Sequence, residues 1–148
     1  DVEGAFALGI VTNEGMDTHQ ILGYSSEHVS SVSWSGRNFA IAMDFEVDTV
    51  SPQLIVGNIG YSNDVNIVNF LSIIDLDLDS IEFNLDLSSI TVVEDEENGE
   101  VRLFVLGGET DELNSILEVN LESGEVEVVF RLDEDTYEGG YFSLLGSN

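Results

Sequence analysis

The hydrophobic positions are most regular between Leu87 and Leu132, where short apolar-rich runs alternate with polar or acidic turns. β-Branched and aromatic runs that are separated by Asn-Gly and Ser-Gly dipeptides are typical of an antiparallel meander of strands. The segment therefore predicts four consecutive strands. Their expected positions are Ser88–Glu94, Val101–Gly108, Ser115–Leu121 and Glu125–Leu132.

Alternation of apolar and polar residues also predicts strands in the first half of the chain. Pro52 marks a break or the start of an edge strand, because proline cannot donate a backbone hydrogen bond. The expected strands are Asp1–Val11, Val29–Trp34, Asn38–Val47 and Gln53–Ile59, with a polar loop through Asn13, Gly15 and Asp17 and turns at Ser35-Gly36 and Tyr61–Asn66. The third of these strands would carry five apolar side chains on one face, namely Phe39, Ile41, Met43, Phe45 and Val47.

The longest alternation runs from Leu71 to Val93. Its phase slips by one residue at Asp79-Ser80, which predicts a bulge or a tight turn there. One face carries Ile74, Leu76 and Leu78, and the other carries Asp75, Asp77 and Asp79. A half-buried sheet with one solvated acidic face explains this pattern. No stretch shows helical periodicity with caps, so the helix content is expected to be low.

Chain length and hydrophobic content indicate one folded domain. The chain has 148 residues, of which 43% are hydrophobic, and such a chain can bury a core and is not a disordered acidic tail. We expect a single all-β domain over residues 1–148. No apolar run reaches the roughly 20 residues that span a bilayer, so membrane insertion is not expected. The chain begins at Asp1 rather than at Met, which is typical of a processed form or an excised segment.

The charge is strongly unbalanced, with 30 Asp and Glu against three arginines, for a net charge of −27. Such a chain repels itself, and salt or bound cations relieve the repulsion. It also repels DNA and RNA, so no nucleic-acid partner is expected. Two settings suit this charge: the cytoplasm of a halophile, and an extracellular, cell or virion surface that meets calcium. Cysteine is absent, which excludes disulfides and thiol chemistry.

Weak internal repetition is visible in two places. The segment His28–Phe45 aligns with Leu87–Gly107, because each has paired serines, a strand, a glycine-containing turn and a second strand. The sequence VEGAFALG (Val2–Gly9) is similarly echoed by YEGGYFSLLG (Tyr137–Gly146).

The pattern SSITVV…NGEVRLFVL…SILEVNLESGEVEVVFRL resembles one four-stranded blade of a β-propeller, and Glu-Gly followed by aromatic residues resembles the opening of a next blade in phytase-like or esterase-like propellers. The resemblance implies a calcium-dependent hydrolase that acts on phosphate esters or simple esters. However, 148 residues are barely enough for a four-bladed propeller, and only two to three blade-like units are present. We therefore predict an antiparallel β-sandwich or jelly-roll-like meander, with blades as the alternative.

Calcium is the only cofactor that the residues suggest. Asp75, Asp77 and Asp79 resemble a calcium loop, but Ser80 replaces the required glycine and flanking helices are missing, so either a solvated face or a peripheral ion site fits better. The acidic turns offer mixed oxygen ligands, or are simply soluble hairpin tips. The turn candidates are Glu94, Asp95 and Glu97 in EDEENGE, the ETDE turn at Glu109–Glu112, and Asp133 and Asp135 in DED.

No catalytic set can be assembled from the sequence. His19 and His28 match no zinc spacing, no G-x-S-x-G elbow occurs, and there is no phosphate-binding loop. The absence of lysine excludes Schiff-base chemistry. Several aromatic residues near turns could contact a carbohydrate or a protein, or could pack in the core: Trp34, Tyr61, Tyr137, Tyr141 and Phe142.

These observations favour a non-enzymatic structural or surface domain, of the adhesin, surface-layer, capsid or filament kind. Such a domain would act through a protein partner or by self-association as a homo-oligomer or filament, because a strand-rich chain offers edges for pairing. The calcium-dependent hydrolase is the alternative, and a DNA-mimic inhibitor is a third hypothesis that rests on the acidity alone.

Overall fold

A computed structural model describes residues 6–12, 15–21, 26–45, 50–77, 81–108 and 114–131. Within these ranges the chain is almost entirely β-structure, and its one helical segment is the 3₁₀ turn η1 (Ser26–His28). All strand pairs are antiparallel. The prediction of an all-β fold with little helix is therefore confirmed.

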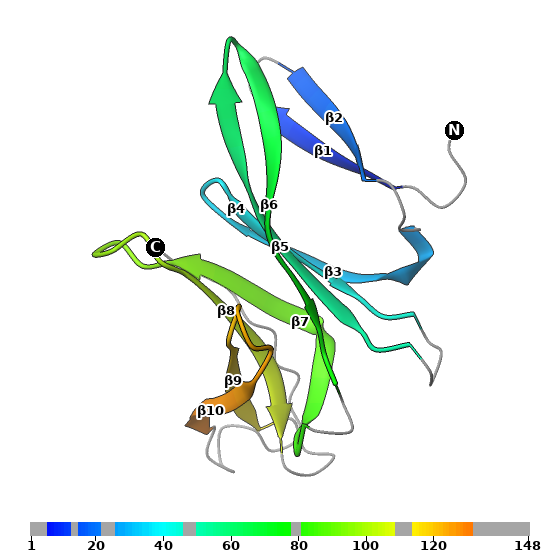
Figure 1. Cartoon of the computed structure of the whole chain (residues 1–148), viewed down its shortest axis with the longest axis vertical. Helices are drawn as coiled ribbons and strands as arrows, with labels where there is room; N and C mark the ends of the chain where they lie inside the picture. Colours follow the sequence, from blue (N-terminus) through cyan, green and yellow to red (C-terminus); the bar gives the residue numbers. More distant parts are fainter. Residues whose placement is uncertain are drawn as a thin grey trace.

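The strands form one hairpin and two four-stranded sheets (Figure 1). The hairpin consists of β1 (Phe6–Thr12) and β2 (Gly15–Ile21). The first large sheet has the order β3 (Val29–Ser35), β4 (Asn38–Met43), β5 (Gln53–Ser62) and β6 (Val65–Asp75). The second consists of β7 (Asn84–Glu94), β8 (Val101–Gly108), β9 (Ser115–Val119) and β10 (Val126–Arg131).

Each large sheet is a meander of strands consecutive in sequence, so the predicted C-terminal meander is confirmed. The two segments that align in the sequence occupy corresponding places, because each contains most of the first two strands of one meander, β3–β4 or β7–β8. The two sheets pack face to face in a sandwich-like arrangement, and the described residues form neither a closed barrel nor a propeller ring.

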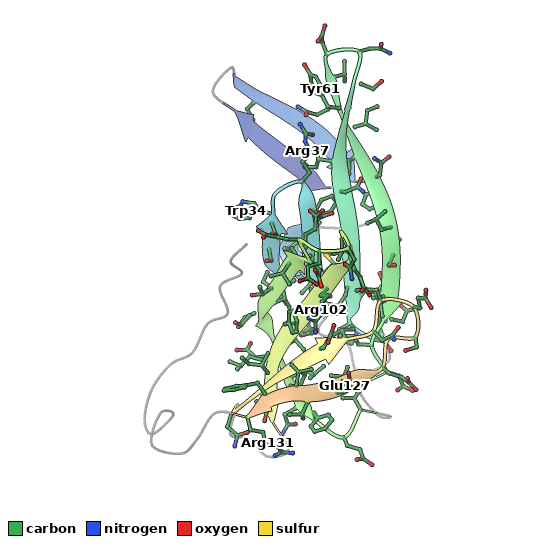
Figure 2. The ribbon with its side chains drawn as sticks, turned by 90° about the vertical axis from the view of Figure 1, so that its left-hand side faces the viewer. Trp34, Arg37, Tyr61, Arg102, Glu127 and Arg131 are labelled. Carbon is green, nitrogen blue, oxygen red and sulfur yellow. The ribbon has the colours of Figure 1, made fainter. Side chains whose placement is uncertain are left out.

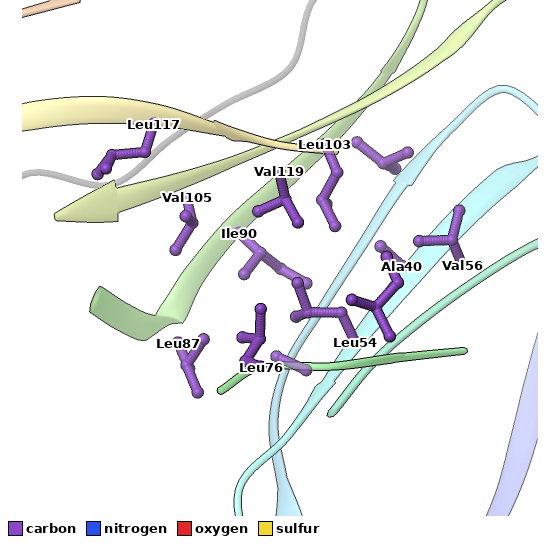
Figure 3. Close-up of a cluster of buried hydrophobic side chains, with 13 residues drawn as sticks. Ala40, Leu54, Val56, Leu76, Leu87, Ile90, Leu103, Val105, Leu117 and Val119 are labelled. Carbon is purple, nitrogen blue, oxygen red and sulfur yellow. The ribbon is translucent and has the colours of Figure 1, made fainter. Parts of the chain in front are cut away.

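The main core fills the space between the two sheets (Figure 3). Ala40 and Ala42 of β4 face it together with Leu54 and Val56 of β5. The second sheet contributes Ile90, Val92, Leu103, Val105, Leu117 and Val119. Full burial of a Val, Leu or Ile side chain contributes about 1.5–3 kcal/mol, so this cluster is the main force that joins the sheets.

Both faces of β4 are buried, whereas the sequence predicted only one apolar face for this strand. Phe39, Ile41 and Met43 lie on the predicted face and form a second cluster with Ile55. The main core, however, lies on the other face, where the small alanines sit. The reason is positional: β4 is an interior strand, and a strand covered on both faces loses the contrast between apolar and polar positions.

Several predicted boundaries were wrong. Gly15 and Asp17, expected in a loop, belong to β2, because pairing with β1 runs without a break from Thr12↔Gly15 to Phe6↔Ile21. Only Asn63 and Asp64 form the turn expected over Tyr61–Asn66. Both have positive φ angles (51° and 63°), as a two-residue hairpin turn requires.

Two further expectations concern strand interruptions. Pro52 does precede a strand, but β5 lies between β4 and β6 and is not an edge strand. The carbonyl of Pro52 accepts a hydrogen bond from the backbone of Leu76, at 2.8 Å. The bulge expected at Asp79-Ser80 lies outside the described residues. A register shift occurs instead within β7, between Asp86, which pairs with Leu106, and Ile90, which pairs with Val105.

The first strands of the two sheets, β3 and β7, are in contact along their edges. The hydroxyl of Ser31 donates to the carbonyl of Leu87 at 2.7 Å, and the backbone N–H of Val92 donates to Ser33 Oγ at 3.1 Å. Serines of β3 thus satisfy backbone groups of β7 that would otherwise form an open edge. The outermost strands of the two sheets are β6 and β10.

Candidate functional site

The outer strand β6 has no charged residue over positions 65–74 (VNIVNFLSII), although the chain contains 30 Asp and Glu. Among the described strands only β5 pairs with it. Large apolar side chains along it are 43–56% exposed, and these are Val65, Ile67, Phe70, Leu71 and Ile73. A long apolar edge strand of this kind offers unpaired backbone groups to another strand.

Local sequence explains why β6 forms. Its β-branched and aromatic residues favour extended backbone, and the Asn63-Asp64 turn sets its register against β5. One irregularity interrupts the pairing: Val56 pairs with Ser72 and Gly57 with Phe70, so Leu71 is left out as a bulge. Residues 65–70 before the bulge form a regular ladder.

The far half of β6 belongs to a two-stranded arm. The pairing of β4 with β5 ends at Asn38↔Asn58, whereas β5 continues to pair with β6 up to Ser62↔Val65. The hairpin therefore extends past the end of β4, as Figure 1 shows. Asn69 Nδ2 donates to Asn58 Oδ1 across the base of this arm, at 3.0 Å.

Arg37, from the turn between β3 and β4, fastens the arm to the sheet. Its Nη1 donates to the carbonyl of Ile59 at 2.9 Å, and its guanidinium lies 5.9 Å from the centre of the Tyr61 ring. Figure 2 shows both at the same end of the molecule, away from Arg102 and Glu127. Tyr61 is 60% exposed and Trp34 is 75% exposed, so neither packs in the core. Tyr137, Tyr141 and Phe142 lie outside the described residues.

An acidic groove of about 920 Å³ lies beside the other half of β6. Leu71 and Ser72 form one wall, and the ends of β8, β9 and β10 form the rest. Its charged residues are Glu100, Arg102, Glu118, Glu122, Glu125 and Glu127. With five carboxylates against one guanidinium, the groove disfavours an anionic ligand.

Arg102 forms an ion pair with a neighbouring side chain within this groove. Its Nε and Nη2 donate to the two carboxylate oxygens of Glu118, both at 2.8 Å, and its guanidinium lies 5.0 Å from the centre of the Phe104 ring. The hydrogen bonds to Arg102 lower the pKa of Glu118, and those to Glu118 raise the pKa of Arg102. The pair is therefore ionised at neutral pH.

The predicted calcium ligands do not converge in the described part of the chain, where no three His, Cys, Asp or Glu side chains are arranged to hold a metal ion. Asp75 and Asp77 are exposed, and Asp75 accepts a hydrogen bond from Gln53 Nε2 at 2.7 Å. Asp79, the Glu109–Glu112 turn, Asp133 and Asp135 lie outside the described residues.

Two carboxylates of the EDEENGE turn instead accept hydrogen bonds from protein groups. Glu94 accepts a hydrogen bond from Asn38 Nδ2 at 2.7 Å, and Asp95 Oδ1 accepts one from the backbone of Glu97 at 2.8 Å. Gly99 completes the turn with a φ of 70°. These contacts explain the turn as a hairpin connection, and calcium binding there stays a prediction.

The histidines remain separate from any cluster of ligands that the structure describes. His28 packs against Phe45, with ring centres 5.3 Å apart, and its Nε2 lies 3.4 Å from Glu27 Oε1. His19 pairs with Leu8 in the β1–β2 hairpin, and its side chain lies outside what the structure describes.

No family model, curated protein or solved structure matches this chain. The resemblance to propeller blades, and the calcium-dependent hydrolase that it implies, therefore stay predictions. No helix in the described residues is long and apolar enough to cross a membrane.

The strand over residues 65–70 was not predicted, because the expected turn covers Tyr61–Asn66 and the expected alternation begins at Leu71. The signal that was present is the β-branched and aromatic content of residues 65–70 (VNIVNF), which favours a strand.

Proposed function

We propose that this chain is a non-enzymatic structural domain that self-associates, and that the outer edge of β6 is its contact surface. The observation that carries the proposal is the combination of an edge position, exposed apolar side chains and absence of charge in residues 65–74. A strand added to such an edge gains main-chain hydrogen bonds and covers apolar side chains.

Charge supports this choice of surface. Natural edge strands are commonly protected from pairing with other chains by charged side chains, especially lysine, or by proline. This chain has 30 acidic residues that could protect β6 in this way. None lies between Asp64 and Asp75. By contrast, the outer strand of the other sheet, β10, carries Glu127 and Arg131.

The acidity fits a domain that works where ions are plentiful. A protein with 27 excess negative charges can approach a copy of itself only where the repulsion is screened. An extracellular, cell or virion surface provides such conditions, as does the cytoplasm of a halophile. In either setting the chain would serve as a surface-layer, adhesin-like, capsid or filament subunit.

The test is the molar mass in solution, measured by light scattering after size-exclusion chromatography over a range of concentrations in high salt. We expect a concentration-dependent oligomer. Val65→Lys and Ile67→Lys should each weaken association by roughly tenfold or more, because a burial loss of ~1.4 kcal/mol has that effect.

Val50→Lys is the matched control. Val50 is 46% exposed, lies outside every described strand, and undergoes the same change in charge. It should leave association unchanged. A chain that stays monomeric at every concentration and salt level would refute the proposal, as would equal effects of the lysine at all three positions.

A further inference from the structure

We infer that β6 pairs with β6 of a second copy of this chain, antiparallel and about a twofold axis at one of residues 66–69, within the regular ladder of residues 65–70. The inference rests on the proposed self-association and names its partner strand and symmetry. It would join the β3–β6 sheets of two copies into one continuous eight-stranded sheet.

The charge of the chain restricts which strand can be the partner. A second copy brings 27 excess negative charges, so its contacting segment must itself be free of carboxylates. Residues 65–74 of β6 meet that condition. The outer strand β10 carries Glu127 and is interrupted by a register shift between Val128 and Phe130.

Self-complementarity points the same way, because in a pair of β6 strands the same charge-free residues meet on both sides. An isologous contact of this kind also closes on itself and gives a dimer rather than a filament.

The two halves of β6 are not equivalent, which locates the axis. The half near Leu71 and Ser72 lies beside the groove that holds five glutamates, and a copy placed there would bring a second such groove close by. The bulge at Leu71 also breaks the ladder at that point. Residues 65–70 are regular and partly on the arm that extends beyond β4 (Figure 1).

Strand geometry then gives a sharp experimental consequence. A twofold axis normal to the sheet keeps every side chain on its own face, and opposed residues in an antiparallel pair share a face. One residue at the axis therefore lies opposite its own copy, with Cα atoms about 4.5–5.5 Å apart. A neighbour one position along is displaced from its copy by two residues, or about 6.6 Å, along the strand, which exceeds disulfide reach.

The chain has no cysteine, so single cysteines can report this geometry without background. The experiment introduces Asn66→Cys, Ile67→Cys, Val68→Cys and Asn69→Cys separately in the full chain and oxidises each under dilute, high-salt conditions. We expect one position to give a disulfide-linked dimer in high yield and its neighbours to give little. Val50→Cys controls for random collision, and circular dichroism verifies that each variant keeps its β-structure.

The outcomes separate the inference from the proposed function. A concentration-dependent oligomer that the β6 lysine variants weaken, but in which none of the four cysteines links above the Val50→Cys level, would overturn the β6–β6 pairing and leave the proposed function standing. An open series of larger species would likewise favour a head-to-tail contact over the dimer. A protein that stays monomeric throughout would overturn both.

Discussion

The carboxylate of Glu118 accepts two parallel hydrogen bonds from Arg102, from Nε to Oε1 and from Nη2 to Oε2, both at 2.8 Å. One of only three cations in the chain is thus held by a single acid on the neighbouring strand. Across the next strand boundary, Glu118 lies directly opposite Glu127 in the β9–β10 register. The same carboxylate therefore has one attractive and one repulsive neighbour.

The first prediction concerns Glu118→Gln, which removes the ion pair and its charge-assisted hydrogen bonds. Because the pair is partly exposed, we expect a loss of only about 0.5–1 kcal/mol in the free energy of unfolding at neutral pH. Glu127→Gln is the control, since it relieves like-charge repulsion and should be neutral or slightly stabilising. Urea denaturation of the three proteins measures both effects, and an equal loss in the two variants would contradict the assignment.

The pH dependence of the Glu118→Gln effect follows from the direction in which the pKa of Glu118 is shifted. Arg102 lowers the pKa of Glu118 in the folded state, so the stabilisation is fully present above the ordinary glutamate pKa. It is lost as the pH falls through the lowered pKa of the folded state. The difference in stability between the native chain and the Gln variant should therefore shrink towards zero in acid. A difference that persisted or grew at acid pH would show that the ion pair is not its source.

The second prediction concerns Gly57, at the bulge that shapes β6. A Cβ atom there would overlap the carbonyl oxygen of Asn69 and lie 2.5 Å from Cζ of Phe39. We expect Gly57→Ala to destabilise the fold by about 1–3 kcal/mol or more, because backbone and a buried ring must move. Gly60→Ala is the matched control on the same strand, where the nearest atom is the side-chain Nδ2 of Asn69 at 3.2 Å.

Thermal unfolding midpoints of the two glycine variants test this prediction. A large drop for Gly57→Ala and a small change for Gly60→Ala would support the close packing of β5, β6 and Phe39. Similar midpoints for both variants would argue against it.

The third prediction concerns salt. The net charge of −27 means that the unfolding temperature should rise gradually with NaCl as repulsion is screened. A melt series in NaCl, and in CaCl₂ at matched ionic strength with a chelator control, measures this. A melting temperature that is flat in NaCl would contradict the prediction. A step at millimolar calcium that the chelator reverses would support the predicted calcium binding.

Much of the secondary structure could be predicted because period-two alternation reports directly on half-buried strands. The four strands after Asn84 illustrate this: Ser-Gly and Asn-Gly turns and β-branched runs mark them in the sequence. Alternation also predicted the exposed aspartates at 75 and 77, since the residues that alternate with them, Ile74 and Leu76, are buried. Strand β1 lies almost entirely within the predicted strand Asp1–Val11, whereas β2 was not predicted because its sequence (GMDTHQI) is mostly polar.

The candidate site could not be predicted in the same way. Strands β5 and β6 are similar in composition and differ mainly in their position in the sheet. The apolar side chains of β6 are exposed because no described strand lies beyond it. The same holds for Phe39 and Ala40, adjacent in sequence, whose faces belong to different clusters. Sheet order is set by contacts between distant segments, and alternation within one strand contains no information about them.

The sequence by itself determined the all-β class, the C-terminal meander and the net negative charge, which disfavours nucleic acid and other anionic ligands, because these follow from local periodicity and composition. Only the tertiary structure decided that β3 covers β7 through Ser31 and Ser33, and that β6 and β10 are the outermost strands. The physical reason is that an edge is a relation between strands. A charge-free run becomes a contact surface only when the folded chain leaves its backbone groups facing outward.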